Sequence, residues 1–96
     1  MPFALQVIKE NIPGEVIPIA SEGITLGRSS GHILFEDVEI SGLQCSIKFM
    51  SGELILTDHG SRNGTFVNGI KIEKAKLKAS DTIRLGDHQF RVVEWP

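Results

Sequence analysis

The sequence is built from short apolar runs rich in β-branched residues, each ended within a few positions by Gly, Pro, Asn, Asp or Ser. No long stretch places apolar residues at i, i+3, i+4 and i+7, the spacing of an amphipathic helix. Runs bounded in this way are typical of strands joined by tight turns. The predicted strands are Phe3–Lys9, Glu15–Ile19, Ile24–Gly27, Ile33–Phe35, Gln44–Phe49, Glu53–Thr57, Thr65–Val67, Ile70–Ile72, Thr82–Leu85 and Gln89–Glu94. The pattern therefore predicts an all-β fold.

Several of these runs alternate between apolar and polar residues. Cys45, Ile47 and Phe49 fall on one face of their strand, and Ile83 and Leu85 do the same in theirs. Strands with one apolar face, closely spaced along the chain, favour antiparallel sheets packed face to face. Cys45 is accordingly interpreted as a core residue.

Two turn signals and one ambiguous segment complete this pattern. Asn68-Gly69 lies between two short runs and predicts a tight β-hairpin. Asn11–Glu15 predicts a second hairpin turn, because it combines Asn, Pro and Gly. Glu73–Ala79 is consistent either with a helical turn, from its Lys and Ala content, or with a loop that Leu77 holds against the core.

Length, charge and cysteine content exclude several classes of protein. Ninety-six residues predict one domain. Ten basic and twelve acidic side chains give a net charge of −2, which argues against binding nucleic acid or an anionic membrane through bulk charge. The single Cys45 forms no internal disulfide. No signal peptide or membrane-spanning run is evident, so we expect a cytoplasmic protein.

The sequence carries no recognisable enzyme motif. Phosphate-binding GxxxxGK[ST] and GxGxxG loops and the GxSxG nucleophile elbow are all missing. His32, His59 and His88 are scattered and have no obvious nucleophile or metal partner, so they are interpreted as surface residues. We expect no catalytic residue, no metal and no cofactor.

Three loops instead have the composition of an anion-binding site. They are Gly27–Gly31, Ile40–Gly42 and Asp58–Thr65, which combine Gly, Ser and, in two of them, Arg. Glycine allows backbone N–H groups to approach an anion, and Arg presents a planar set of donors that matches phosphate oxygens. The alternative is that they are ordinary turns with solubilising Arg side chains, and spacing alone does not show that they meet.

Taken together, these segments resemble the forkhead-associated (FHA) domain family. The residues that carry the resemblance are Ile24-Thr25-Leu26-Gly27-Arg28, Ile33-Leu34-Phe35, Val38-Glu39-Ile40-Ser41, Asp58, Ser61, Asn63-Gly64-Thr65, Asn68-Gly69, Leu77, Asp81-Thr82-Ile83, Leu85-Gly86-Asp87 and Phe90. The resemblance implies one domain over residues 1–96, an antiparallel β-sandwich of two twisted sheets with about eleven short strands. It also implies a non-catalytic signalling module that binds phosphothreonine in a partner protein, or in a phosphorylated segment of its parent chain, as a monomer.

The same resemblance assigns roles to individual residues. Arg28 is expected to bind the phosphate directly, and the Ser41 hydroxyl and the Gly42 backbone N–H to donate to its oxygens. Arg62 occupies a position where the family often has a phosphate-contacting side chain. Asn63 is expected to bind the peptide main chain beside the phosphothreonine. The residues expected to be architectural are Gly27, Gln44, Gly64, Thr65, Asn68 and Gly69.

The chain departs from the family pattern in the second loop. The family commonly has Ser-Arg-x-His, whereas this chain has Ser41-Gly42-Leu43-Gln44. Gln44 can replace the loop-bridging His because its amide both donates and accepts, but the missing Arg removes a positive charge. The alternative function is therefore a degenerate FHA-like domain that binds proteins without phosphate.

A single-stranded nucleic-acid binder is opposed by the net charge and by the lack of Tyr. Glu39 lies in the loop that in this family tends to meet residues after the phosphothreonine, so it is expected to disfavour acidic residues there.

Overall fold

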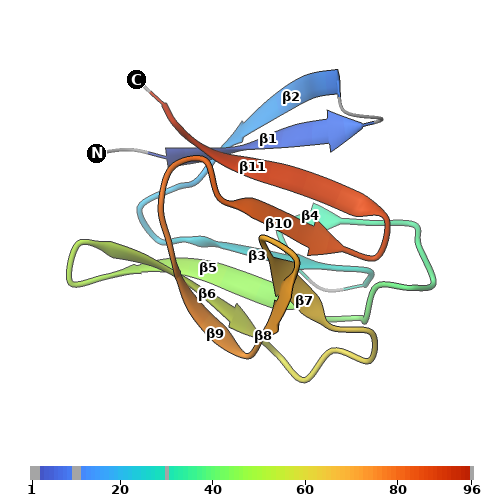
Figure 1. The fold of residues 1–96 in the computed structure, drawn as a ribbon. Coiled ribbons are helices and arrows are strands. Elements are labelled where there is room, and N and C mark those ends of the chain that lie inside the picture. The colour runs from blue at the N-terminus through green and yellow to red at the C-terminus, as the bar shows by residue number, and fades with distance from the viewer. Residues whose placement is uncertain (1–2, 10–11, 30, 96) are drawn as a thin grey trace.

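The computed structural model describes residues 3–9, 12–29 and 31–95 and forms eleven strands, with no helix among those residues (Figure 1). The strands are β1 (Phe3–Lys9), β2 (Ile12–Pro18), β3 (Ile24–Gly27), β4 (Ile33–Leu34), β5 (Cys45–Met50), β6 (Glu53–Asp58), β7 (Thr65–Val67), β8 (Ile70–Ile72), β9 (Lys74–Leu77), β10 (Thr82–Leu85) and β11 (His88–Glu94). The all-β prediction is confirmed.

The strands form two sheets. The six-stranded sheet has the order β2-β1-β11-β10-β7-β8, and the five-stranded sheet has the order β4-β3-β5-β6-β9. Neighbouring strands pair antiparallel except β3 and β4, where Leu26 lies opposite Ile33 and Gly27 opposite Leu34 in parallel register. This short parallel pair forms because the chain folds straight back after β3, and the His32 N–H donates to the Thr25 carbonyl at 2.8 Å.

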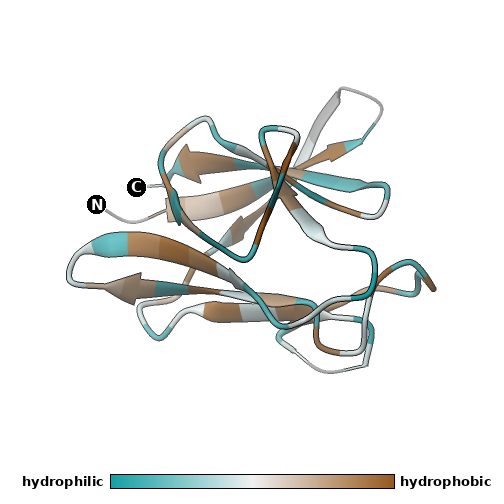
Figure 2. Cartoon of the chain, turned by 60° about the horizontal axis from the view of Figure 1, so that its bottom comes forward, coloured by the Kyte–Doolittle hydropathy of each residue, from teal (hydrophilic) through white to brown (hydrophobic). Residues whose placement is uncertain are grey.

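The hydrophobic core lies between the two sheets and follows the predicted alternation. Its fully buried members come from both sheets and include Leu5, Leu26, Ile47, Leu56, Ile83, Leu85, Phe90 and Val92. In Figure 2 the hydrophobic segments follow the strands of both layers, while most hydrophilic segments lie in the loops. Each large apolar side chain buried in this way stabilises the fold by roughly 1.5–3 kcal/mol. No helix of the described chain is long and apolar enough to span a membrane.

Most predicted strand bounds agree with the structure to within one residue. The strands with unchanged bounds are Phe3–Lys9, Ile24–Gly27, Thr65–Val67, Ile70–Ile72 and Thr82–Leu85. The Asn68-Gly69 turn is confirmed, with both residues at positive φ (51° and 84°) between β7 and β8.

The prediction for the start of β2 was wrong. This strand begins at Ile12 rather than Glu15, so Pro13 and Gly14 belong to a strand and not to a turn. The pairing with β1 shifts by one residue between Gln6 and Ile8, which indicates a β-bulge. A bulge in an edge strand accommodates Pro and Gly, which explains why the turn signal misled the prediction. The hairpin pairing itself is present, and Asn11 lies outside the described residues.

The segment Glu73–Ala79 is neither a helical turn nor a simple loop. It contains β9, which pairs antiparallel with the edge of β6, with Leu77 opposite Leu54. Leu77 is buried in the core, while Lys74 and Lys76 point to solvent. Alternation of Lys with apolar residues is a common arrangement for an edge strand, where charge also opposes unwanted pairing.

Candidate functional site

The three loops singled out in the sequence meet at one end of the sandwich, opposite the end at which β1 begins and β11 ends (Figure 1). The Arg28 N–H donates to the Ser41 carbonyl at 2.9 Å, and the Ser29 N–H donates to the Gly42 carbonyl at 3.1 Å. The Arg62 N–H donates to Ser41 Oγ at 2.8 Å. Ser41 therefore bonds to both of the other loops. The structure thus shows that the three loops meet, which their spacing in the sequence could not show.

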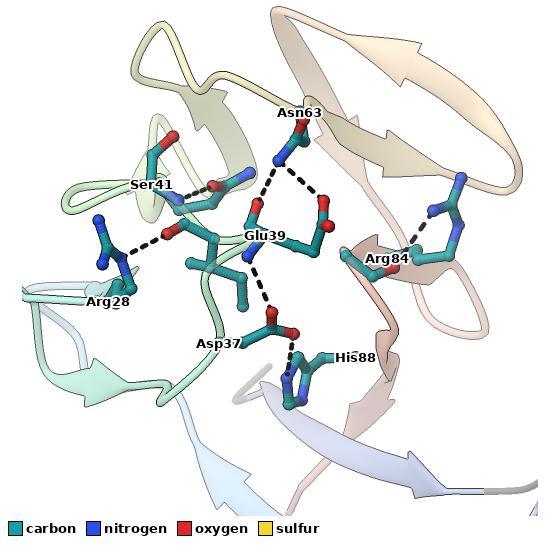
Figure 3. A network of polar contacts seen from close by, with 10 residues as sticks. Arg28, Asp37, Glu39, Ser41, Asn63, Arg84 and His88 are labelled. Carbon is teal, nitrogen blue, oxygen red and sulfur yellow. Dashed lines mark hydrogen bonds and ion pairs between the residues drawn. The ribbon is translucent and has the colours of Figure 1, made fainter.

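Arg28 follows β3 directly and its side chain is exposed. Its Nε donates to the Ile40 carbonyl at 3.1 Å (Figure 3). Neither terminal amino group of the guanidinium donates to another described residue. The contact through Nε fixes the orientation of the planar group and leaves its outer donors for a ligand, which is the arrangement that bidentate phosphate recognition requires.

Ser41 and Gly42 provide further donors beside Arg28. The Ser41 hydroxyl oxygen accepts from the Arg62 N–H, so its own hydrogen remains for another acceptor. No described residue accepts a hydrogen bond from the Gly42 N–H. Together with Arg28, these groups form a set of donors at the exposed end of the sandwich.

Gln44 is the buried link beneath these loops. It is only 1% exposed, and its Oε1 accepts from the Ser41 N–H at 2.9 Å. Its Nε2 donates to the Gly64 carbonyl at 2.9 Å and to Thr65 Oγ1 at 3.1 Å. The side chain thus connects the loop that carries Ser41 with the loop that carries Gly64. Gly64 is buried at a φ of 91°, where a side chain would be strained and would contact Lys71.

Asp58 shapes the third loop. Its Oδ1 accepts from the Ser61 hydroxyl at 2.5 Å and from the Thr65 hydroxyl at 2.7 Å, and its Oδ2 accepts from the Ser61 N–H at 3.0 Å. Burial raises the pKa of this carboxyl, but these hydrogen bonds outweigh burial and hold the pKa below its ordinary value. No specific role at the site was predicted for Asp58. The Asp-x-x-Ser spacing is the signal that indicates such a turn.

Arg62 and Asn63 contact the loop that precedes Ser41. One terminal amino group of Arg62 donates to the Val38 carbonyl at 2.6 Å. The Asn63 Nδ2 donates to the Glu39 carbonyl at 2.9 Å and to Glu39 Oε2 at 3.0 Å (Figure 3). Both side chains are exposed, but in this structure each holds the neighbouring loop. One of the donor groups of the Arg62 guanidinium is therefore already engaged within the protein.

Asn68 and Gly69, two of the residues expected to be architectural, lie outside the three loops. Asn68-Gly69 forms the β7–β8 turn, and the Asn68 side chain donates to Asp81 Oδ1 at 3.0 Å and accepts from the Thr82 N–H at 3.0 Å. These contacts attach the hairpin to the start of β10. Gly27, by contrast, lies directly before Arg28, buried at the end of β3.

A series of hydrogen bonds from His88 through Asp37 holds the loop that carries Glu39, and the sequence analysis did not predict it. His88 Nε2 lies 3.1 Å from Asp37 Oδ2, and Asp37 Oδ1 accepts from the Glu39 N–H at 2.8 Å (Figure 3). His88 is therefore half-buried and partnered, not simply solvated. His32 and His59 are exposed as predicted, but each also has a hydrogen-bond partner: His32 Nδ1 accepts from the Thr25 N–H at 3.0 Å, and His59 Nε2 lies 2.8 Å from Ser46 Oγ. The three histidines do not meet, and the described residues hold no group of side chains suited to bind a metal ion.

The free donors of these loops suit recognition of an oxyanion. The FHA domain model matches residues 24–86, which include Arg28, Ser41 and Asn63. The chain belongs to the FHA domain family. This result confirms the resemblance found in the sequence, and FHA domains are interaction modules, not enzymes.

Three relatives illustrate the match. The glycogen accumulation regulator GarA of Mycolicibacterium smegmatis is 34% identical over 61 residues, which are 64% of this chain and 37% of that protein. The chain thus spans little more than a third of the length of this relative. The FHA domain of CT664 from Chlamydia trachomatis superposes with a TM-score of 0.88 at 25% identity over 100% of both chains. An FHA domain solved in work on phosphothreonine-dependent FHA interactions superposes with a TM-score of 0.87 at 25% identity, covering 100% of this chain and 99% of its own.

Proposed function

We propose that this FHA domain binds a phosphothreonine-containing segment at the three loops. The observation that carries the proposal is the position of Arg28: its Nε donates to the carbonyl of Ile40, the residue before Ser41, and its outer guanidinium donors have no acceptor among the described residues. Phosphothreonine has a charge of about −1.5 to −2 at pH 7 and three strong acceptor oxygens. A planar cation flanked by a hydroxyl and a backbone N–H satisfies these acceptors.

Each residue has a distinct role in this proposal. Arg28 binds two phosphate oxygens, and Ser41 and Gly42 each donate to one. Asn63 binds the main chain of the peptide beside the phosphothreonine. Arg62 orients the Ser41 hydroxyl through its backbone N–H, and its side chain contributes positive charge while one terminal amino group donates to the Val38 carbonyl.

The proposal extends to the setting of the domain. The ligand is a phosphorylated segment of another protein or of the parent chain, and the domain over residues 1–96 acts as a cytoplasmic monomer without catalytic activity of its own. The phosphothreonine-dependent interactions of a structural neighbour support this choice of ligand.

A second candidate function is protein binding without phosphate. It is favoured by Gly42, which stands where the family commonly has Arg, and by the Arg62 guanidinium, which contacts the Val38 carbonyl. In that case the same loops would bind an unmodified segment, and Arg28 would contribute little.

Titration calorimetry separates the two functions. We expect a degenerate phosphothreonine peptide pool to bind, and the unphosphorylated pool not to bind. Arg28→Ala should abolish binding, because a charge-assisted bidentate contact is lost. Arg91→Ala is the matched control, since Arg91 is exposed on β11 and outside the three loops. Equal binding of phosphorylated and unphosphorylated pools, unaffected by Arg28→Ala, would favour the second function.

A further inference from the structure

The side-chain NH2 group of Asn63 is engaged within the protein. Its Nδ2 carries two hydrogens, and both have an acceptor on Glu39: the carbonyl oxygen at 2.9 Å and Oε2 at 3.0 Å (Figure 3). If Asn63 is to donate to the main chain of a peptide, one of these two bonds must break. The bond to the carboxylate is the one that a side-chain rotation of Glu39 can release.

Within the described part of the chain, the Glu39 carboxylate has no cationic partner. Among the described residues, no Lys, Arg or His nitrogen lies within 4.0 Å of it. The two nearby Arg side chains are directed elsewhere. Arg62 donates to the Val38 carbonyl, and Arg84 donates to the Gly86 carbonyl with its guanidinium 4.1 Å from the centre of the Phe66 ring. An exposed carboxylate held only by a neutral amide favours an incoming cation.

The backbone of Glu39 is held in place, so the exchange is confined to its side chain. The Glu39 N–H donates to Asp37 Oδ1 at 2.8 Å, and Asp37 Oδ2 in turn contacts His88. From the other side, a Cβ placed on Gly86 would lie 3.2 Å from the Glu39 Cβ, which shows how closely the β10–β11 turn packs against this residue. Glu39 therefore stays beside Asn63 when the loop binds a ligand.

We propose that Glu39 makes this site selective for phosphothreonine segments that carry Lys or Arg within about three residues of the phosphothreonine. The incoming cation pairs with the Glu39 carboxylate, and the released Nδ2 hydrogen of Asn63 then donates to a carbonyl of the peptide. Recognition of the basic residue and binding of the peptide main chain are thus coupled. This inference rests on the proposed function.

The coupling ranks three kinds of peptide. A basic residue replaces the contact that the carboxylate loses. A neutral residue leaves the carboxylate without a partner, or leaves the Asn63 NH2 group bonded to Glu39 and unable to donate to the peptide. An acidic residue adds repulsion from Glu39. The expected order of affinity is therefore Lys, then Ala, then Glu.

The test uses phosphothreonine peptides with a single Lys, Ala or Glu placed in turn at each position from three before to three after the phosphothreonine. At one or more positions the wild-type domain should bind the Lys peptide about fivefold more tightly than the Ala peptide. Glu39→Ala should remove this preference and also tighten binding of the Ala peptide, because Asn63 is freed. In an Asn63→Ala background, Glu39→Ala should no longer tighten that binding. Glu94→Ala, at the far end of β11, is the control that should keep the preference.

Two outcomes overturn the inference and distinguish it from the proposed function. If Arg28→Ala abolishes binding while wild type binds Lys, Ala and Glu peptides equally at every position, the function stands and the role of Glu39 is wrong. If wild type binds no phosphothreonine peptide, both fail. A readout without ligand is the NMR signal of the Asn63 side-chain amide, which Glu39→Ala should shift. An unshifted signal would show that the contact is absent and would also overturn the inference.

Discussion

The buried amide of Gln44 donates to the carbonyl oxygen of Gly64 across a sequence separation of twenty residues. The same side chain accepts from the Ser41 N–H and donates to Thr65 Oγ1. One uncharged residue therefore fixes the distance between the loop that carries Ser41 and the loop that carries Asn63. The proposed binding site depends on that distance.

Gln44→Ala should destabilise the domain and weaken phosphopeptide binding together. The substitution leaves the Ser41 N–H and the Gly64 carbonyl without partners, at a cost of about 1–3 kcal/mol for each buried group. Gln44→His should be intermediate, since a neutral imidazole offers one donor and one acceptor. Urea unfolding and calorimetry on the same samples check both effects, with the exposed Gln89→Ala as control. Unchanged stability in Gln44→Ala would contradict the bridging role.

Asp58 should make the loop sensitive to acid. Its folded-state pKa is lower than its unfolded value, since the hydrogen bonds from Ser61 and Thr65 outweigh burial. Such a group stabilises the fold fully above its unfolded pKa, about 3.9, and this stabilisation is lost as the pH falls through the lower folded pKa.

Asp58→Asn should therefore reduce the free energy of unfolding at neutral pH and flatten its decline below about pH 4. Urea unfolding between neutral and acidic pH measures this. Asp87→Asn is the control, because Asp87 is exposed in the β10–β11 turn. Parallel pH curves for wild type and Asp58→Asn would contradict the assignment.

The alternation of apolar residues predicted most strands, because burial on one face leaves a period of two in the sequence. The alternation did not predict two segments, because other features of the fold determine their structure. Pro13 and Gly14 lie in a strand because a bulge accommodates them, and β9 forms because β6 offers a free edge to a Lys-rich segment. The local amino-acid composition indicates neither the bulge nor the free edge of β6.

For the site, the sequence indicated the loops but not how their side chains are oriented. Arg62 was expected to face a phosphate, yet it donates to the Val38 carbonyl. Asn63 was expected to bind a peptide, yet its amide is engaged by Glu39. Both contacts span a separation of 24 residues, so they depend on loop geometry that only the folded structure determines.

Cys45 should be unreactive in the folded domain. Burial, followed by the nearby Asp58 charge, raises the pKa of its thiol to about 12. At pH 8 the thiolate is then scarce and also inaccessible. Alkylation by iodoacetamide should be slow and should accelerate in step with unfolding in urea. Rapid modification of the folded protein would show that the strand carrying Cys45 opens locally.

Gly42→Arg should strengthen phosphopeptide binding by restoring the basic residue that the family commonly has after the phosphate-loop Ser. Gly42 has no unusual φ, and its added Cβ would lie 2.8 Å from Ser29 Oγ, a side-chain atom that can rotate away. The new guanidinium lies beside Arg28, and a bound phosphate relieves the repulsion between them. We expect a gain of about fivefold at low ionic strength, smaller at high salt, since exposed charges are screened.

Gly42→Ala separates charge from the contact with Ser29. It adds the same Cβ without a cation, so its affinity should stay near that of wild type while Gly42→Arg gains. Measuring both variants in calorimetry at two salt concentrations isolates the electrostatic part. If Gly42→Arg and Gly42→Ala bind alike, the added charge does not reach the phosphate, and the missing Arg is not what limits the affinity of this site.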